Sequence, residues 1–271
     1  MKSGFVLNLA FCGLLVTQSL RADDQPDAEG LWKWHGSDAK TFLETWYAKD
    51  PVTGTQRVDF ERYHAAPNVA QVTFSKGVAT FNDSNESLLY ITEVKRFNGM
   101  LNNSPTYATF PDQYGEYREF DGERILEFDR TNKICRISSL SKECAHHAIA
   151  PHPFPLIFTR SALEAQSRFH LRQVDWPSGV VVIEGYPKHD CDKDQFTMFR
   201  ACFDEESYEI RSLVVYGPRF HPIKNPVYDH YTFEHAGTEK ATGLTGTASR
   251  PIDPNSPPPD WRIVSESAVN K

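Results

Sequence analysis

Residues able to bind a metal ion or to transfer protons gather at three places in this sequence. One group holds three histidines, the next alternates acidic residues around a cysteine, and the last falls on a predicted strand. In order they are His146, His147 and His152; His189, Asp190, Cys191, Asp192 and Asp194; and Asp229, His230 and His235. Imidazole, thiolate and carboxylate groups bind zinc, and carboxylates bind calcium. A metal-dependent hydrolase is therefore one hypothesis for the function.

The spacing within these groups weighs against that chemistry. Adjacent side chains of an extended segment point to opposite sides, so His146 and His147 point apart, and the two histidines of the third group also fall on opposite faces. The acidic run lacks the glycine and distal glutamate of an EF-hand loop. Glu116 and Glu119 form an acidic pair typical of a charged surface. No G-x-S-x-G, P-loop, H-E-x-x-H or Rossmann glycine motif occurs. We expect a protein that is not an enzyme and holds no metal or cofactor.

The N-terminal residues predict export. Lys2 precedes an apolar run from Phe5 to Val16, and Ala22 is a suitable cleavage position, so residues 1–22 read as a signal peptide. The apolar run is too short for a membrane-spanning helix. A formal net charge of −7 argues against a nucleic-acid partner, because such proteins present a basic face.

Cysteines beyond the signal peptide number four, an even count that suits two disulfides in an exported chain. They are Cys135, Cys144, Cys191 and Cys202. The pairing between sequence neighbours, first with second and third with fourth, would join the turns of adjacent strands. Three pairings remain open, and so does the alternative that some of these residues are small buried hydrophobic groups.

The apolar residues alternate along most of the chain, which predicts about ten or eleven antiparallel strands with two or three short helices. The helices are expected after Ser37, where Ala39, Phe42, Leu43 and Trp46 share one face, and over residues 161–168. Strands are expected at 56–63, 69–74, 78–81, 87–97, 114–120, 124–129, 133–138, 169–175, 179–185, 195–204, 209–216 and 227–234, with a turn at 75–77, a long loop at 98–113 and a flexible tail at 237–271. The helices must cover one face of the sheet.

The apolar segment Phe154–Phe158 has two interpretations. It fills a core, or it forms a lid over a cavity that is left open for a ligand. Both interpretations bury the same residues.

Three motifs, taken in their order, resemble the outer-membrane lipoprotein carrier (LolA-like) superfamily. The run YREFDGERILEFDRTNKICRIS resembles its central hairpins, and PFPLIF followed by LEAQSRFHL resembles its Pro-Phe helix and next strand. The run from VVVIEGYP to LVVYGP resembles the end of its domain. The residues that fall in the expected places of this last motif are Pro187, Phe196, Asp204, Tyr208 and Ile210. The resemblance spans about Ala39 to His235, and each motif is a pattern of apolar and turn residues.

The resemblance implies a mainly β protein with a few α-helices, an incomplete antiparallel β-barrel whose concave face is covered by short helices. This domain would occupy residues 23–236. It implies a non-enzymatic carrier or sensor in the periplasm of a double-membraned bacterium, which binds a lipid or an acylated protein and also meets a membrane-associated partner. A structural or protein-interaction module of the same fold is the alternative.

The same resemblance implies a set of residues that line an apolar cavity. We assign to it Phe74, Tyr90, Phe128, Phe154, Leu156, Ile157, Phe158 and Leu163. It also implies a buried arginine that ties the helices to the barrel, for which Arg57, Arg62 and Arg168 are candidates.

Overall fold

A computed structural model describes residues 37–49, 56–66, 71–82, 86–101, 104–110, 116–139, 154–157, 159–174, 176, 179–235 and 252–266. The chain divides into two compact units, Met1–Ser37 and Asp38–Lys271, and the description below concerns the second. The predicted signal peptide lies outside the described residues. Within the described ranges, no helix combines the length and the apolar character needed to cross a membrane.

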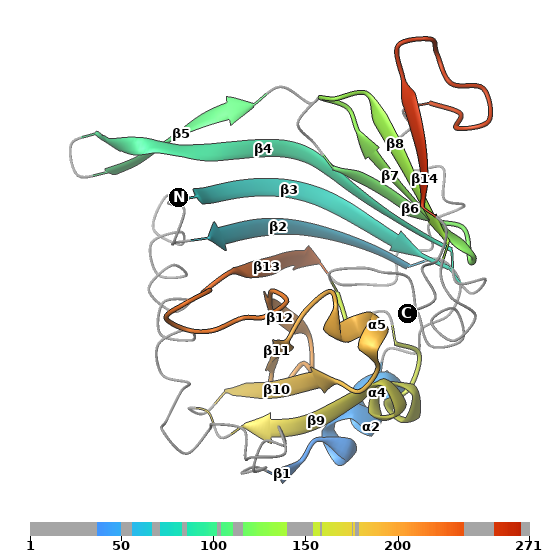
Figure 1. Ribbon diagram of the computed structural model, residues 1–271. Coiled ribbons are helices and arrows are strands. Elements are labelled where there is room, and N and C mark those ends of the chain that lie inside the picture. The colour runs from blue at the N-terminus through green and yellow to red at the C-terminus, as the bar shows by residue number, and fades with distance from the viewer. Residues whose placement is uncertain are drawn as a thin grey trace. The chain divides into compact units, whose positions relative to one another are not determined.

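Fourteen strands of the described residues form one sheet that does not close on itself (Figure 1). The strands are β1 (Ser37–Asp38), β2 (Gln56–Ala66), β3 (Gln71–Phe81), β4 (Ser87–Leu101), β5 (Ser104–Phe110), β6 (Tyr117–Phe120), β7 (Arg124–Asp129), β8 (Ile134–Ser139), β9 (Phe169–Val174), β10 (Val180–Pro187), β11 (Met198–Asp204), β12 (Ile210–Tyr216), β13 (Tyr228–His235) and β14 (Arg262–Glu266). The helices are α2 (Lys40–Lys49), α4 (Ala162–Arg168) and α5 (Asp190–Lys193). This architecture confirms the expected incomplete barrel with few helices.

The strand order shows which distant segments become neighbours. From β9 it runs β9-β10-β11-β12-β13-β2-β3-β4-β6-β7-β8-β14, and β5 pairs with β4 outside this path. The pairing of β13 with β2 brings the last strand of the predicted domain beside the first long one. β14 departs from the antiparallel pattern of the long strands, since it pairs parallel with β8.

One predicted turn is a continuous strand in the structure. β3 runs through residues 75–77 and pairs with β2 over eleven residues, with Gly77 opposite Phe60. A Cβ atom at Gly77 would collide with the Phe60 ring and would lie 2.7 Å from the carbonyl oxygen of Tyr90. The glycine therefore marks a place where a ring crosses the backbone closely, and not a turn.

Two other predictions change for similar reasons. The expected loop at 98–113 contains the end of β4 and all of β5, and the two strands pair around a register shift beside Gly99. Gly99 has a φ of 114°, and its carbonyl accepts a 3.0 Å hydrogen bond from the Thr106 hydroxyl. The expected flexible tail contains β14. The polar, glycine-containing sequences around β5 and β14 lack the apolar alternation by which a strand is predicted.

The sheet has two faces, each with its own apolar cluster. The inner face is the one that carries Val58 and Phe60 on β2 and packs against α2 and α4, whose buried residues include Leu43, Tyr47 and Ala165. The outer face of β4, β6, β7 and β8 carries a second set, called the outer cluster: Leu88, Tyr117, Leu126, Phe128 and Cys135. Phe42 and Trp46 of α2 both pack edge-on against Phe203, at centroid distances of 5.0 Å, which anchors the helix to β11.

Candidate functional site

The inner face changes from apolar to charged along two neighbouring strands. Every second residue of β2 points to this face, and β13 supplies the matching residues across the ladder. In register they are Phe60 with Phe233, Arg62 with Tyr231, and His64 with Asp229. Each step of two residues advances about 6.6 Å, so an apolar wall gives way to charge within the length of one side chain.

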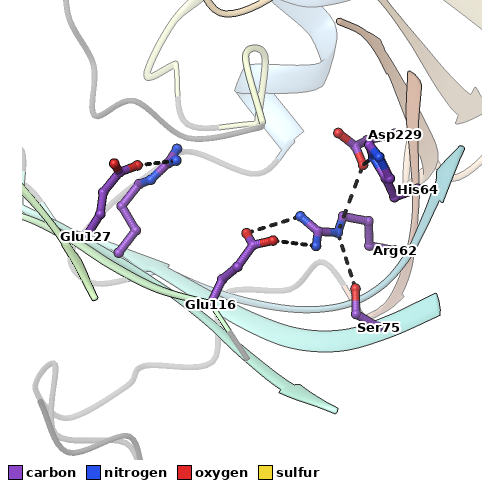
Figure 2. Close-up of polar contacts among 7 residues, drawn as sticks. Arg62, His64, Ser75, Glu116, Glu127 and Asp229 are labelled. Atoms are coloured by element: carbon purple, nitrogen blue, oxygen red, sulfur yellow. Dashed lines mark hydrogen bonds and ion pairs between the residues drawn. The ribbon is translucent and has the colours of Figure 1, made fainter. Parts of the chain in front are cut away.

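Arg62 is the centre of the charged end, which we call the charged patch (Arg62, His64, Ser75, Glu116 and Asp229). Figure 2 shows its guanidinium between the carboxylates of Glu116 and Asp229. Nη2 and Nη1 of Arg62 donate to the two oxygens of Glu116 at 2.7 and 3.2 Å, and Nε donates to the Ser75 hydroxyl at 3.2 Å. Nδ1 of His64 lies 2.9 Å from Oδ1 of Asp229. This paired geometry fixes the guanidinium plane.

The charges of the patch differ in their access to water. The Arg62 side chain is 13% exposed, whereas the Glu116 side chain is 50% exposed. Burial opposes the charged form of Arg62, but the Glu116 and Asp229 carboxylates, the Tyr231 hydroxyl and the hydrogen bonding to Glu116 together outweigh burial and raise the pKa of Arg62. Burial likewise opposes ionisation of Glu116, and the Arg62 charge and hydrogen bonds lower the pKa of Glu116. Both groups are therefore charged at neutral pH.

Tyr231 lies at the boundary between the apolar wall and the charged patch. It is buried, and burial raises the pKa of its hydroxyl well above the ordinary value. The hydroxyl stays neutral beside Arg62, and no hydrogen-bond partner of normal geometry is seen for it in the structure described. A buried polar atom without a partner at such a boundary is a place where a ligand atom would gain a hydrogen bond.

A row of further charges continues the patch across the inner face. Arg118 of β6 forms an ion pair with Glu127 of β7, and Glu127 lies opposite Arg136 of β8 in register. The side chains of Arg118 and Glu127 are about one-third exposed. This part of the sheet presents both signs of charge to solvent.

The apolar end of the site is filled by the protein's own side chains. Phe154 is buried, with ring centroids 5.0 Å from Phe60, 4.8 Å from Tyr231 and 5.8 Å from Phe233. Leu156 and Ile157 are buried in the same cluster, and residues 155–157 form a turn and not a helix. Of the two interpretations left open by the sequence, the described residues of this segment fill a core. Phe158 lies outside the described residues.

The turn is held by hydrogen bonds to α2. The Tyr47 hydroxyl approaches the Leu156 carbonyl at 3.5 Å and makes a short contact with the Thr159 hydroxyl, which itself donates to the Leu156 carbonyl at 2.7 Å. All three residues are buried. The turn is therefore attached to the helix as well as to the sheet.

The structure does not bring the other predicted cavity residues to this place. Phe74, Tyr90 and Phe128 lie on the outer face: Phe74 contacts Tyr63 with ring centroids 4.8 Å apart, and the other two belong to or pack against the outer cluster. Leu163 is 78% exposed on α4. The cavity prediction rests on residue type, whereas the alternation of side chains along the strands assigns these rings to the outer face.

The groups that suggested a metal site have structural roles where they are described. Asp190 pairs with Lys193 at 2.8 Å within α5, and Asp192 is buried against Arg168, which donates to it at 2.7 Å. Burial lowers the pKa of His230 to about 4, so this histidine is neutral. In the described part of the chain, no group of three or more His, Cys, Asp and Glu side chains is arranged to hold a metal ion. The three histidines at 146–152 lie outside the described residues.

The candidate arginines also resolve into distinct roles. Arg57 pairs with Asp59 on its own strand at 2.8 Å, and Arg168 joins α4 to α5 through Asp192. Arg62 joins β2 to Glu116. None of these three ion pairs joins a helix to the sheet: Arg57 and Arg62 pair with residues of the sheet or next to it, and Arg168 joins two helices. The sequence pattern predicts plain surface charge for Glu116 and a turn for Ser75, although the spacing of two residues places Phe60, Arg62 and His64 on one face.

The pairing of cysteines that are neighbours in sequence is wrong. Cys135 and Cys202 form no disulfide and are buried thiols, whereas Cys191 is disulfide-bonded. Cys202 lies on β11, where its side chain is buried. Cys191 sits in α5, before β11 begins.

Comparison with known proteins gives likenesses of fold only. No protein-family model matches the sequence. No curated protein matches it either. Among solved structures, it is similar to an uncharacterized conserved protein from Thermus thermophilus, with 8% identity over 84% of this chain and 100% of that one and a TM-score of 0.38.

Two further solved structures are similar over most of this chain. A LolA superfamily protein from Nitrosomonas europaea shares 9% identity over 73% of this chain and 92% of that one, with a TM-score of 0.35. MucB in the Pseudomonas aeruginosa MucA/MucB complex shares 12% identity over 75% of this chain and 59% of that one, with a TM-score of 0.31. At these scores the likenesses do not assign a function.

Proposed function

We propose that this protein is a non-enzymatic, exported binding protein for an amphipathic, lipid-like ligand. The observation that carries the proposal is the adjacency, on one sheet face, of an apolar wall and a charged patch that reaches solvent at Glu116. An acyl chain would lie against Phe60 and Phe233, in the place now taken by the turn at Phe154, and the polar head would meet Arg62. The protein would act in the periplasm after removal of residues 1–22.

Burial of an acyl chain can offset the free energy lost when the turn at Phe154 leaves the core. Taking a buried phenylalanine out of a core costs about 3–5 kcal/mol. Burying an acyl chain contributes about 0.8 kcal/mol per CH₂ group, so about four to six methylenes offset the loss of Phe154 from its site. Fatty acyl chains are longer than this, and the turn at 154–157 is a short segment whose displacement leaves the paired strands intact.

The charged end supplies orientation. Arg62 already holds a carboxylate in bidentate geometry, and this Glu116 carboxylate is half exposed. An acidic head group replaces Glu116 as the partner of a guanidinium whose plane is fixed by Ser75. The Tyr231 hydroxyl would donate a hydrogen bond to the same head group.

The first experiment is native mass spectrometry of the protein from its exporting host, followed by organic extraction and titration with a fluorescent fatty acid. We expect a co-purified lipid and micromolar binding of the probe. The absence of both would contradict the proposal. N-terminal sequencing of the same sample should begin at Asp23, directly after Ala22.

Two variants separate the apolar and charged parts of the site. Phe154→Ala should bind the fatty acid more tightly while lowering stability, and Phe128→Ala, its match in the outer cluster, should lower stability without a change in affinity. Arg62→Leu should weaken binding of the fatty acid about tenfold but leave a fatty alcohol unaffected, because only the acid pairs with the guanidinium. Equal effects on both ligands would place the head group elsewhere.

A second candidate is a protein-interaction module, which the partly exposed charges of Arg118, Glu127 and Arg136 favour. Both signs alternate across these strands, as at a surface that orients a partner. A photo-crosslinker at Glu127 tests it in the exporting host. Specific cross-linking to one protein, together with a lipid-free preparation that binds no fatty acid, would favour this candidate over the first.

A further inference from the structure

The C-terminal segment 252–266 lies at the end of the strand order and is attached on one side. Its strand β14 pairs in parallel with β8, residues 262–266 against 134–138, and among the described strands none follows it in the order (Figure 1). The central strands, by contrast, are paired on both sides; β3, for example, pairs with β2 and with β4. β14 is thus an edge strand of the described sheet.

The segment covers the outer cluster. Trp261 and Ile263 are two residues apart and pack on it together with Ile252, and the Trp261 ring lies 6.4 Å from the Phe128 ring. Beneath them, Cys135 is fully buried. The Arg262 N–H donates to the Lys133 carbonyl at 2.9 Å. The edge of β8 and the outer cluster therefore form a groove that binds an extended chain through backbone bonds and alternate apolar side chains.

The attachments of the segment are weak compared with those of the sheet. Its apolar side chains are only partly buried. The ion pair of Lys133 with Asp260 is half exposed on both sides, and such pairs add little. Segments with few buried contacts open before the rest of a protein unfolds. Opening here would leave an unpaired strand edge beside an apolar surface, which is the template for strand addition.

We propose that this groove is a strand-binding site whose second occupant is the same segment of another copy of the chain, so that two molecules exchange their C-terminal strands. An incoming segment brings the same Trp261, Ile263 and Asp260 to the same partners. Residues 236–251, sixteen positions, connect β13 to the segment and extend to about 50 Å when stretched, enough to reach a neighbouring molecule. Exchange of an identical element is a low-cost route to a dimer.

The native thiol of Cys135 allows the C-terminal segment to be held in the groove by a disulfide in the full-length protein. Cys135 is the register partner of Ile263, and aligned residues of neighbouring strands lie about 4.8 Å apart, within the range for a disulfide. Ile263→Cys should therefore form a disulfide with Cys135 on oxidation, which peptide mapping verifies. The probe is a fluorescent peptide of residues 252–266, added to full-length protein, and dimer formation is followed by native mass spectrometry.

We expect wild type to take up the peptide slowly and to form dimers at high concentration. Trp261→Ala in the protein should bind the peptide about tenfold better, because the resident segment loses its largest anchor. Oxidised Ile263→Cys should lose peptide binding and dimers, and reductant should restore both. Arg262→Cys, whose side chain is exposed, is the matched control and should behave as wild type under the same oxidation.

Three results would overturn the proposal. Uptake of the peptide by oxidised Ile263→Cys at the wild-type level would place the binding elsewhere. A folded Trp261→Ala variant that binds no peptide would show that the groove takes no second strand. Peptide binding without dimers at any concentration would refute exchange between copies and leave the groove to a different extended segment.

Discussion

Arg62 takes its partners from residues far apart in the sequence, and this sets the character of the site. Glu116, which holds it in bidentate geometry, is 54 residues away, and Asp229 reaches it from β13. A second charged group, Glu184, is fully buried between Arg172 and Arg200 on the opposite face of β10, the face that also carries His230 on β13. These buried charges are paired, whereas the buried histidine is neutral.

That histidine makes stability depend on pH. The pKa of His230 is about 4 in the folded protein, because burial disfavours its charged form, and 6.5 is its ordinary value. Above pH 6.5 neither state is protonated and the contribution is fully present; it is lost as the pH falls toward 4, where the unfolded chain binds the extra proton. We expect a loss of about 2 kcal/mol between pH 7.5 and 5, measured by urea unfolding.

The control for this prediction is His230→Leu. This variant removes the titrating group from the same buried position and should flatten the fall in stability between pH 6.5 and 4. An unchanged pH profile in the variant would show that other groups cause the fall.

At the scale of elements, the long inner strands depend on close packing between a backbone and a ring. Phe60 of β2 lies over Gly77 of β3, beside a register shift between β3 and β4. The same ring contacts Phe154 and Tyr231. Gly77 thus couples the course of β3 to the position of the turn that fills the site.

Gly77→Ala should destabilise the protein by about 1–3 kcal/mol, because the new methyl group overpacks this contact. Urea unfolding measures the change. Phe60→Leu in the same chain should recover part of the loss by vacating the space of the ring, and the double-mutant cycle should show coupling of about 0.5 kcal/mol or more. Strictly additive effects would contradict the packing argument.

At the scale of the whole molecule, the covalent links show which parts of the chain are constrained. Cys191 is disulfide-bonded, while Cys135 and Cys202 are thiols inside the outer cluster and β11. Burial raises the pKa of the Cys202 thiol, which further lowers its reactivity.

Alkylation under native conditions should therefore leave Cys135 and Cys202 unmodified, and both should react after unfolding without reductant. Cys191 should react only after reduction. Mass spectrometry of the peptides reads out all three residues. Reaction of Cys191 before reduction, or no reaction of Cys202 in the unfolded chain, would contradict this assignment.

Much of the fold could be predicted from the sequence because its signals are local. The alternation of apolar residues marks most strands, and the spacing of Phe42, Leu43 and Trp46 marks α2. The predictions that failed were those in which glycine was taken for a turn at residues 75–77 or polar composition for loop at 98–113. At residues 75–77 the structure is decided by the packing of the Phe60 ring against the backbone, and at 98–113 by the pairing of β4 with β5. Neither interaction leaves a local pattern in the sequence.

By itself the sequence determined a mainly β, acidic chain with few helices, because periods of two and of about four residues follow directly from backbone geometry. Only the tertiary structure decided that β13 pairs with β2, that Phe74 lies outside while Arg62 lies inside, and that His64 meets Asp229 across 165 residues. Alternation assigns residues to two faces but does not say which face is covered or which strand lies alongside. Those choices depend on the burial summed over the whole sheet.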